Sequence, residues 1–345
     1  MNPPIIAVCQ GPQLSEVAIL FRGFRRELIA LIARRNCRAM VTAMRGVLPR
    51  EQSPLRMKAP FRKRRLTLVR ALLAALALAS LGAAQPVADK VLFDQWASVT
   101  EPSPGPATPI GFYSAGCLQG AQALPRDGDG YAVMRPSRRR FYGHPALVSY
   151  LTELAARTQN EGRRLLLIGD LGLPRGGPML TGHASHQNGL DADIWFMTRT
   201  TRPTDVERER LSAPGFVSGR KTLRSTWGSA QARLLVAAAD NADINRIFVS
   251  PPIKRYMCRY FSTAPWLYRL RAWWGHEDHF HVRLKCPGDH SLCREQEAVD
   301  PLDNGCGADL DWWFSREADR EWARLAASTE PRPFPELPAE CKAIR

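Results

Sequence analysis

The sequence lacks several features that would assign the chain to a common class of protein. It has no internal repeat, no long low-complexity linker, no C-x-x-C pair and no nucleophilic serine motif. His276 and His279 lie three positions apart instead of four, so the helical H-E-x-x-H zinc motif is also missing. The apolar run from Ala71 to Leu81 has about 11 residues, fewer than the roughly 20 that a membrane-spanning helix requires. These absences argue against a repeat protein, a C-x-x-C zinc or redox centre and a permanent membrane span.

Residues 57–84 have the layout of a secretory signal peptide. Met57 opens a basic stretch, the apolar run follows, and the small residues 82–84 offer a cleavage site. We therefore expect an exported mature protein of residues 85–345.

Residues 1–56 precede this signal, where a secreted precursor is expected to have no residues. The simplest interpretation is a start codon assigned too early, which would make Met57 the first residue. The alternative is a genuine amphipathic leader containing Leu20, Phe21 and Phe24.

The positive charge is concentrated before the mature chain. The whole sequence has 48 Lys and Arg against 33 Asp and Glu, and a net charge of +15 ordinarily indicates nucleic acid or another anionic partner. Residues 1–84 hold 15 of these basic residues and only 3 acidic ones, which leaves a net charge of +3 for the remainder. We therefore expect no nucleic-acid binding.

The remaining 261 residues suffice for one large domain.

Six cysteines follow the signal, an even number in a chain expected to leave the reducing cytosol, so disulfides are expected. Six cysteines allow 15 pairings that sequence alone does not sort. Only Cys286 and Cys293, separated by a turn-rich segment, suggest a local pair.

Helical and strand patterns alternate irregularly along the mature chain. Apolar residues recur at helical spacing over 147–154 and 232–239, whereas the short apolar runs 164–168 and 246–250 indicate buried strands. Without a βαβ rhythm, this mixture predicts an α+β fold. Two proline-containing segments are expected to wrap the domain as an N-terminal arm and a C-terminal tail, residues 100–111 and 329–340.

Five of the seven histidines lie in residues 182–193 and 276–281. Neutral imidazole and carboxylate groups suit Zn²⁺, and a catalytic zinc keeps three protein ligands with one open position. A lone histidine is more often structural, and we interpret His144 and His290 in that way. The clustered histidines instead predict a zinc site.

Strand alternation indicates which of these side chains can converge. In residues 279–284, His279 and His281 share one face and the apolar residues share the other. Asp191 and Asp193 share a face of the preceding D-x-D segment in the same manner. Two strands are thus expected to present histidine and aspartate to one cleft.

Two segments carry a resemblance to a known family, residues 182–193 and residues 279–287, with shorter matches at 141–145, 168–170 and 246–249. They resemble the penicillin-insensitive murein endopeptidases over nearly all of the mature chain. That family is grouped with lysostaphin-type and D-Ala-D-Ala carboxypeptidase-type zinc peptidases, which share H-x6-D and H-x-H motifs. The resemblance implies a small central antiparallel sheet flanked by helices, hedgehog or D-Ala-D-Ala carboxypeptidase-like, and stabilised by disulfides.

By position, the resemblance implies roles for individual residues. The zinc ligands would be His186, Asp193 and His281, with His183 as a further candidate ligand. His279 would be the general base, and His276 would assist, for example by donating a hydrogen bond to the developing oxyanion.

Asp191 would fix a ligand imidazole or remain a solvated carboxylate.

The family's cysteine pattern implies the pairs Cys117–Cys341, Cys258–Cys306 and Cys286–Cys293. Family members can carry an Asp and a His where this chain has Ser218 and Lys221, so we expect no second full metal site.

The implied activity is zinc-dependent hydrolysis of D-alanyl-meso-diaminopimelyl cross-links in peptidoglycan, in the periplasm of a Gram-negative cell. Spacing alone does not separate an endopeptidase from a carboxypeptidase that trims a terminal D-Ala. A non-catalytic peptidoglycan-binding protein with a structural zinc is a further alternative, although structural sites usually have four ligands and favour cysteine. The expected partners are cross-link peptides, and the sequence carries no signal for an oligomeric state.

Overall fold

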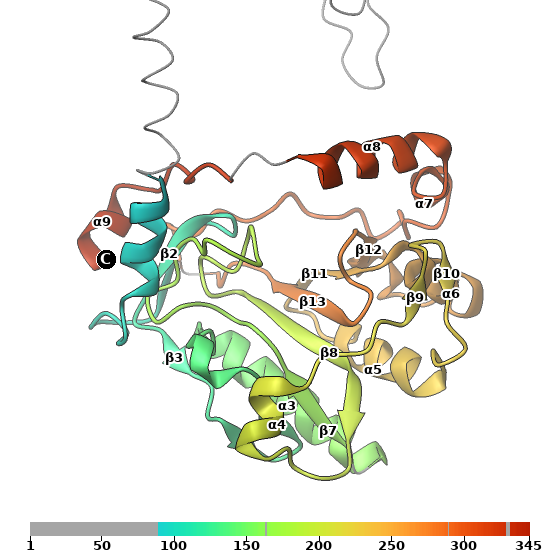
Figure 1. Ribbon diagram of the computed structural model, residues 1–345, viewed down its shortest axis with the longest axis horizontal. Helices are drawn as coiled ribbons and strands as arrows, with labels where there is room; N and C mark the ends of the chain where they lie inside the picture. Colours follow the sequence, from blue (N-terminus) through green and yellow to red (C-terminus); the bar gives the residue numbers. More distant parts are fainter. Residues whose placement is uncertain (1–88, 163, 289, 329–331) are drawn as a thin grey trace, which may run out of the picture. The chain divides into compact units, whose positions relative to one another are not determined.

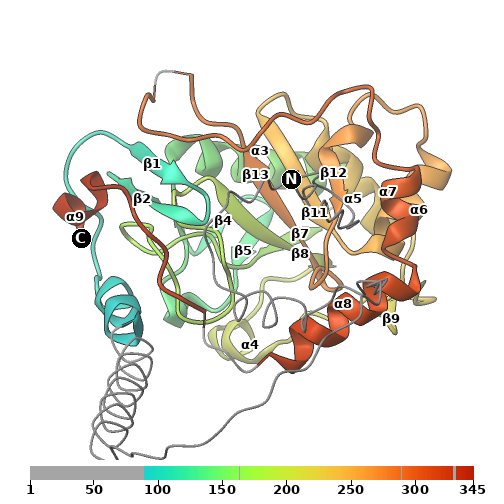
Figure 2. The same ribbon diagram turned by 90° about the horizontal axis from the view of Figure 1, so that it is seen from above.

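The computed structural model describes residues 89–162, 164–288, 290–328 and 332–345 (Figures 1 and 2). The predicted secretion signal and the segment before it lie outside the described residues. In the described part of the chain, no helix is both long and apolar enough to cross a membrane.

A seven-stranded sheet forms the centre of the described chain, in the order β12-β11-β13-β8-β7-β5-β4. Its strands are β4 (Asp127–Gly128), β5 (Tyr131–Val133), β7 (Leu165–Ile168), β8 (Asp191–Arg199), β11 (Ile244–Val249), β12 (Leu270–Ala272) and β13 (His279–Leu284). The strands predicted around 164–168, 246–250 and 279–284 are confirmed.

Most neighbouring strands in this sheet are antiparallel, but two pairs are parallel, β5 with β7 and β11 with β12. Each parallel pair is joined through a helix, α3 (Pro145–Gly162) or α6 (Pro251–Tyr260), because the chain must return to the same end of the sheet before it can pair in parallel. These two parallel pairs were not expected from the sequence, which showed no βαβ rhythm. The predicted mixture of helices with a mostly antiparallel sheet is confirmed.

The remaining elements are short strand pairs and helices around this sheet. The strand pairs are β1 (Thr108–Phe112) with β2 (Ala115–Gln119), β3 (Gln122–Ala123) with β6 (Tyr142–Gly143), and β9 (Val217–Ser218) with β10 (Thr222–Leu223). The other helices are α4 (Asp205–Arg210), α5 (Ser229–Ala239), α7 (Ala308–Trp312), α8 (Arg316–Ala327), α9 (Glu340–Ile344) and the 3-10 turns η1 (Pro136–Arg138) and η2 (Leu267–Arg269).

Both predicted core helices are present, as α3 and α5. Pro145 opens α3, where its missing N–H costs nothing, and His144 Nδ1 accepts a hydrogen bond from the Ala146 N–H. Leu147, Leu151 and Leu154 are fully buried, so the apolar stripe of α3 packs on the core. His144 thus has the structural role predicted for it.

The two faces of the central strands differ, as their alternation predicts. Phe280, Val282 and Leu284 on β13 are at most 1% exposed and belong to the main hydrophobic core with residues of α3 and α5. Figures 1 and 2 both place α8 on the opposite side of β8 and β13 from α3. The polar face of β13 therefore points away from the main core.

The two ends of the described chain meet, because the Cys117–Cys341 disulfide joins β2 to α9. Around it, Trp96, Ile110 and Leu173 form a second buried cluster, against which Leu337 packs. Phe334 and Leu337 of the predicted C-terminal tail thus pack against this cluster, whereas the last residues of the predicted N-terminal arm form β1.

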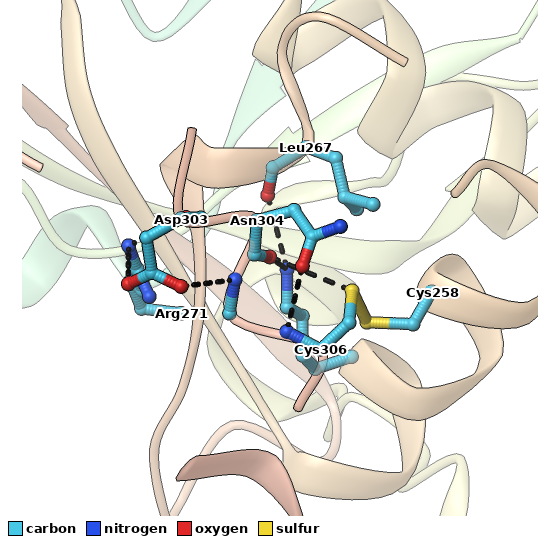
Figure 3. Close-up of a disulfide and its surroundings, with 8 residues drawn as sticks. Cys258, Leu267, Arg271, Asp303, Asn304 and Cys306 are labelled. Atoms are coloured by element: carbon cyan, nitrogen blue, oxygen red, sulfur yellow. Dashed lines mark hydrogen bonds and ion pairs between the residues drawn. A yellow bond between two sulfur atoms is a disulfide. The ribbon is translucent and has the colours of Figure 1, made fainter. Parts of the chain in front are cut away.

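The structure contains the three disulfide pairings implied by the resemblance, Cys117–Cys341, Cys258–Cys306 and Cys286–Cys293. Figure 3 shows Cys258–Cys306 next to the ion pair of Arg271 with Asp303. Cys258 lies on α6, so this bond ties α6 to the loop after β13.

Candidate metal centre and active site

The pairing of β8 with β13 brings the predicted site residues together. His281 is opposite Asp193, and Arg283 is opposite Asp191. Directly opposed residues in an antiparallel pair point to the same face, so these four side chains gather on the polar face. All four are buried, with at most 6% of any residue exposed. Such burial of charged groups requires that each has partners.

Asp191 connects the two strands to the loop that carries His186. Its carboxylate accepts hydrogen bonds from Arg283 Nε at 2.8 Å and Arg283 Nη2 at 2.9 Å, and its Oδ2 accepts one from the His186 backbone N–H at 3.0 Å. Burial alone would raise the pKa of Asp191, but Arg283 and then His281 hold it well below its usual range. Asp191 is therefore a charged internal group, not a solvated one.

The loop before β8 holds His186 in an unusual backbone conformation. His186 has a φ of 67°, in the left-handed region that few non-glycine residues adopt. Gly189 follows with a φ of 78°, and a Cβ there would lie only 2.3 Å from Leu118 Cδ2. The hydrogen bond from His186 N–H to Asp191 helps to hold the strained residue in place.

The imidazole of His186 is oriented to offer a lone pair. Its Nδ1 donates to the Leu171 carbonyl at 2.8 Å, so Nε2 of the neutral ring carries the lone pair. Nε2 lies 3.4 Å from Asp193 Oδ1. Orientation through a carbonyl is the usual arrangement for a metal-binding histidine.

Three buried atoms in this region have no hydrogen-bond partner among the described residues: His186 Nε2, Asp193 Oδ1 and His281 Nε2. Buried polar atoms are rarely left without partners, and those that are require an explanation such as an ion. They belong to the three residues predicted as zinc ligands. Imidazole nitrogen with carboxylate oxygen is also a donor set that zinc accepts, so the residues fit a zinc ion.

His183 completes a compact group with His186 and Asp193. One ligand atom from each of the three residues lies within 4.8 Å of the others, a spacing that suits a metal ion. His183 Nδ1 is 3.5 Å from Asp193 Oδ2, while its Nε2 is 2.9 Å from the buried carboxylate of Asp170. His183 therefore has a fixed orientation and a free ring nitrogen toward the site.

His281 is less directly aligned with this group. Its ring lies 4.5 Å from the His186 ring, and its Nδ1 is 3.6 Å from Asp193 Oδ1. Burial lowers the pKa of His281 to about 4, so the ring is neutral at neutral pH and able to bind a metal. Its Nε2 lies 3.2 Å from Asp191 Oδ1, without hydrogen-bond geometry.

His279 lies at the edge of the site and is one-fifth exposed. Its Nδ1 is bonded to Asp278 Oδ1 at 2.6 Å, and its Nε2 is 3.7 Å from Asp193 Oδ1. Burial favours the neutral ring, but the Asp193 carboxylate and then Asp278 raise the pKa of His279 to about 9. The nitrogen that faces the site is therefore the one that can exchange a proton.

His276 packs beside His279, with their ring centres 5.1 Å apart. Its Nδ1 donates to the Trp274 carbonyl at 2.9 Å, and burial lowers its pKa to about 3. The ring is therefore neutral, and Nε2 is an acceptor. This arrangement does not support a hydrogen bond from His276 to an oxyanion, and it suits a role as acceptor or accessory ligand.

Ser218 and Lys221 lie in the β9–β10 hairpin, where Lys221 Nζ forms an ion pair with Asp319 Oδ2 at 2.6 Å. A paired lysine offers no ligand to a second cation.

A cavity of about 720 Å³ opens beside these residues and is lined by His183, Asp193 and His279. Asp170 and three arginines, Arg135, Arg138 and Arg140, line it as well. The sequence interpretation gave these four residues no role. The basic run at 138–140 was the available signal, but only the fold places it beside the histidines.

Comparison with known proteins agrees with this geometry. Residues 109–345 match the family described as "Penicillin-insensitive murein endopeptidase". A protein of that name from Haemophilus influenzae is 43% identical over 247 residues, which are 69% of this chain and 85% of the relative. One from Salmonella paratyphi A is 40% identical over 252 residues, 72% of this chain and 90% of the relative. One from Shigella boydii serotype 18 is 39% identical over 277 residues, 79% of this chain and 96% of the relative. The chain therefore belongs to the family of penicillin-insensitive murein endopeptidases.

Proposed function

We propose that the protein is a zinc metalloendopeptidase that hydrolyses D-alanyl-meso-diaminopimelyl cross-links of peptidoglycan in the periplasm. One observation carries the metal part of this proposal: His186, Asp193 and His281 each have a buried atom without a hydrogen-bond partner in the described part of the chain, beside a cavity of about 720 Å³. The substrate part rests on the family, whose named relatives are murein endopeptidases.

In this proposal His186, Asp193 and His281 hold the zinc, and His183 is the alternative or additional ligand. When bound, zinc supplies Lewis acidity toward an amide carbonyl and toward water. Asp191 supports the ligands without binding the zinc. It accepts a hydrogen bond from the His186 backbone N–H and balances the charge of Arg283. It thereby keeps the ligands on the two strands and the preceding loop in register.

His279 is the group that we assign to proton transfer. Asp278 fixes its Nδ1, which leaves Nε2 toward the cavity. The Asp193 carboxylate is the largest influence that raises the pKa of His279. A zinc ion held by Asp193 would offset the charge of this carboxylate and so favour the neutral His279 ring that a general base requires.

The proposed activity is tested with purified protein and a cross-linked muropeptide dimer. Mass spectrometry of the products should show monomers that result from cleavage of the D-alanyl-diaminopimelyl amide. A chelator should abolish turnover, zinc should restore it, and penicillin should have no effect, since the mechanism forms no acyl-serine.

The same assay separates the alternatives. Release of free D-alanine from uncross-linked peptides, with the dimer left intact, would show a carboxypeptidase. Binding of the dimer without any cleavage would show a non-catalytic peptidoglycan-binding protein with a structural zinc.

A further inference from the structure

The cavity beside the candidate metal centre is lined by acidic residues, among them Glu277 and Asp278, and by three arginines for which the proposed mechanism has no use. Arg135, Arg138 and Arg140 all line it, close to His183 and Asp193. We propose that Arg138 is a binding subsite for a free carboxylate of the substrate, the one on the carbon that bears the leaving amine. This inference rests on the proposed function and names the chemical group of the substrate that the site recognises.

The three arginines differ in how many of their N–H groups already donate hydrogen bonds within the protein. Arg140 is 16% exposed and donates to Asp170 Oδ2 at 2.9 Å and to the Thr181 carbonyl at 3.2 Å. Arg135 donates to the Leu211 carbonyl at 2.8 Å. Arg138 is 46% exposed and has one hydrogen-bond partner among the described residues, Asp170 Oδ2 at 3.2 Å. Most of the guanidinium of Arg138 is therefore available to a ligand.

The backbone that presents Arg138 is rigid. The 3-10 turn Pro136–Arg138 is flanked by Arg135 and Arg139, both in the left-handed region with φ of 56° and 53°. Glu209 clamps the turn, accepting from Ser137 N–H at 2.9 Å and from Ser137 Oγ at 2.7 Å. Strained residues held by several contacts are typical of functional sites.

At Asp170, the arginines outnumber the carboxylate that they contact. The Asp170 carboxylate is shared by Arg138, Arg140 and His183, so one negative charge faces two permanent positive charges. Asp170 is almost fully buried, so its carboxylate depends on these three side chains for its partners. An incoming carboxylate would balance the second arginine, and the arginine fork suits carboxylate geometry.

The chemistry of the proposed cross-link supplies such a group. Its leaving amine belongs to the α-amino acid end of a diaminopimelyl side chain, so the carbon next to the nitrogen carries a carboxylate. That carboxylate must lie within a few ångströms of the cleaved bond. Arg138 lies close enough to meet this requirement, since its Nη1 and the Nε2 of His183 both contact Asp170 Oδ2, at 3.2 and 2.9 Å.

The experiment compares two matched muropeptide dimers, one with this carboxylate free and one with it converted to a carboxamide, while all other carboxylates stay free. The wild-type enzyme should favour the free acid, mainly through a lower KM. Arg138→Gln should lower kcat/KM for the free acid by about 10- to 100-fold, the size expected for a charge-assisted hydrogen-bond pair. Turnover of the carboxamide dimer should stay nearly unchanged.

The matched control is Arg139→Gln, on the same turn, because Arg139 donates to the Ala97 carbonyl and does not line the cavity. It should keep the wild-type preference, and Arg138→Lys should recover part of it. The proposed subsite is contradicted if Arg138→Gln lowers kcat/KM equally for both dimers while zinc content is normal. It is also contradicted if the wild-type enzyme shows no preference for the free acid. A wild-type enzyme that cleaves neither dimer would instead overturn the proposed function, and the subsite with it.

Discussion

At the scale of residues, the site is built around a buried ion pair between Asp191 and Arg283. Asp191 and Arg283 are almost fully buried and face each other across β8 and β13, and Arg283 donates two hydrogen bonds to the Asp191 carboxylate. The Arg283 guanidinium also lies 4.1 Å from the Tyr113 ring. Such a pair specifies register strongly, because breaking it leaves a buried charge without a partner.

Replacing Asp191→Asn should therefore lower the free energy of unfolding by about 3–5 kcal/mol, as measured by denaturant titration. Zinc affinity should fall as well, because the His186 N–H loses a charged acceptor. Asp311→Asn is the matched control: it breaks an ion pair with Arg255 whose carboxylate is 75% exposed, and should change stability little. A loss of equal size in both variants would contradict the role assigned to Asp191.

A second buried charged residue lies far from the metal centre. Lys254 on α6 is fully buried, and its Nζ donates to the Leu267 and Asn304 carbonyls at 3.0 and 2.5 Å. Burial, and next the charge of Arg271, lower the pKa of Lys254 to about 7. Figure 3 shows these carbonyl groups beside the Cys258–Cys306 disulfide. Lys254 therefore links α6 to the loop that the disulfide also holds.

The stability of the protein should depend on pH through Lys254. Its pKa is about 7 in the folded protein and near 10.5 in the unfolded chain, so the unfolded chain binds more protons between these values. The contribution of Lys254 to the free energy of unfolding should therefore rise as the pH increases through that window. Denaturation of wild type and Lys254→Met across the window should show a difference that grows with pH in favour of the wild type. A difference that is constant with pH would contradict this.

At the scale of elements, the disulfides join segments that lie at very different distances along the chain. Cys117 and Cys341 are 224 positions apart and hold α9 against β2, whereas Cys286 and Cys293 are 7 positions apart. A cross-link that closes a longer loop restricts the unfolded chain more.

Replacing Cys117 and Cys341 together by alanine should lower the free energy of unfolding by about 5.4 kcal/mol, the value of the loop-entropy relation for so long a loop. Replacing Cys286 and Cys293 should cost less, about 2–3 kcal/mol. Melting curves of both double variants test the order. A larger loss from the short loop would show that strain or local packing decides the effect.

The elements that the sequence predicted best are those with a local pattern. The apolar spacing of residues 147–154 gave α3, and the alternation in 279–284 gave β13 and its two faces. The parallel crossovers were missed because strand pairing depends on contacts between distant residues, which local periodicity does not encode.

The same distinction applies to the site. Histidine clustering indicated the residues of the metal centre, but the strained backbone of His186 and the pairing of Asp170 with Arg138 depend on tertiary structure. The Nδ1 bond of His276 to the Trp274 carbonyl, which fixes its tautomer, could not be inferred from spacing either. A likeness to the hedgehog or D-Ala-D-Ala carboxypeptidase fold stays a prediction.

At the scale of the whole molecule, the three disulfides fit the proposed export, because an oxidising compartment keeps such bonds formed. Amino-terminal sequencing of protein recovered from the periplasm of its host should give a chain that begins near Gln85. Recovery of a mature species that keeps residues 1–56 would contradict both the proposed signal and the misassigned start.

The central claim is that zinc is held by His186, Asp193 and His281 while His279 moves the proton. Zinc content and muropeptide cleavage, measured on the same preparations of His281→Ala and His279→Ala, test it most directly. His281→Ala should lose both zinc and activity. His279→Ala should keep nearly stoichiometric zinc while turnover falls by about 10²- to 10⁴-fold, the range for a lost general acid or base. Full retention of zinc by His281→Ala, or its loss from His279→Ala, would contradict this division of roles.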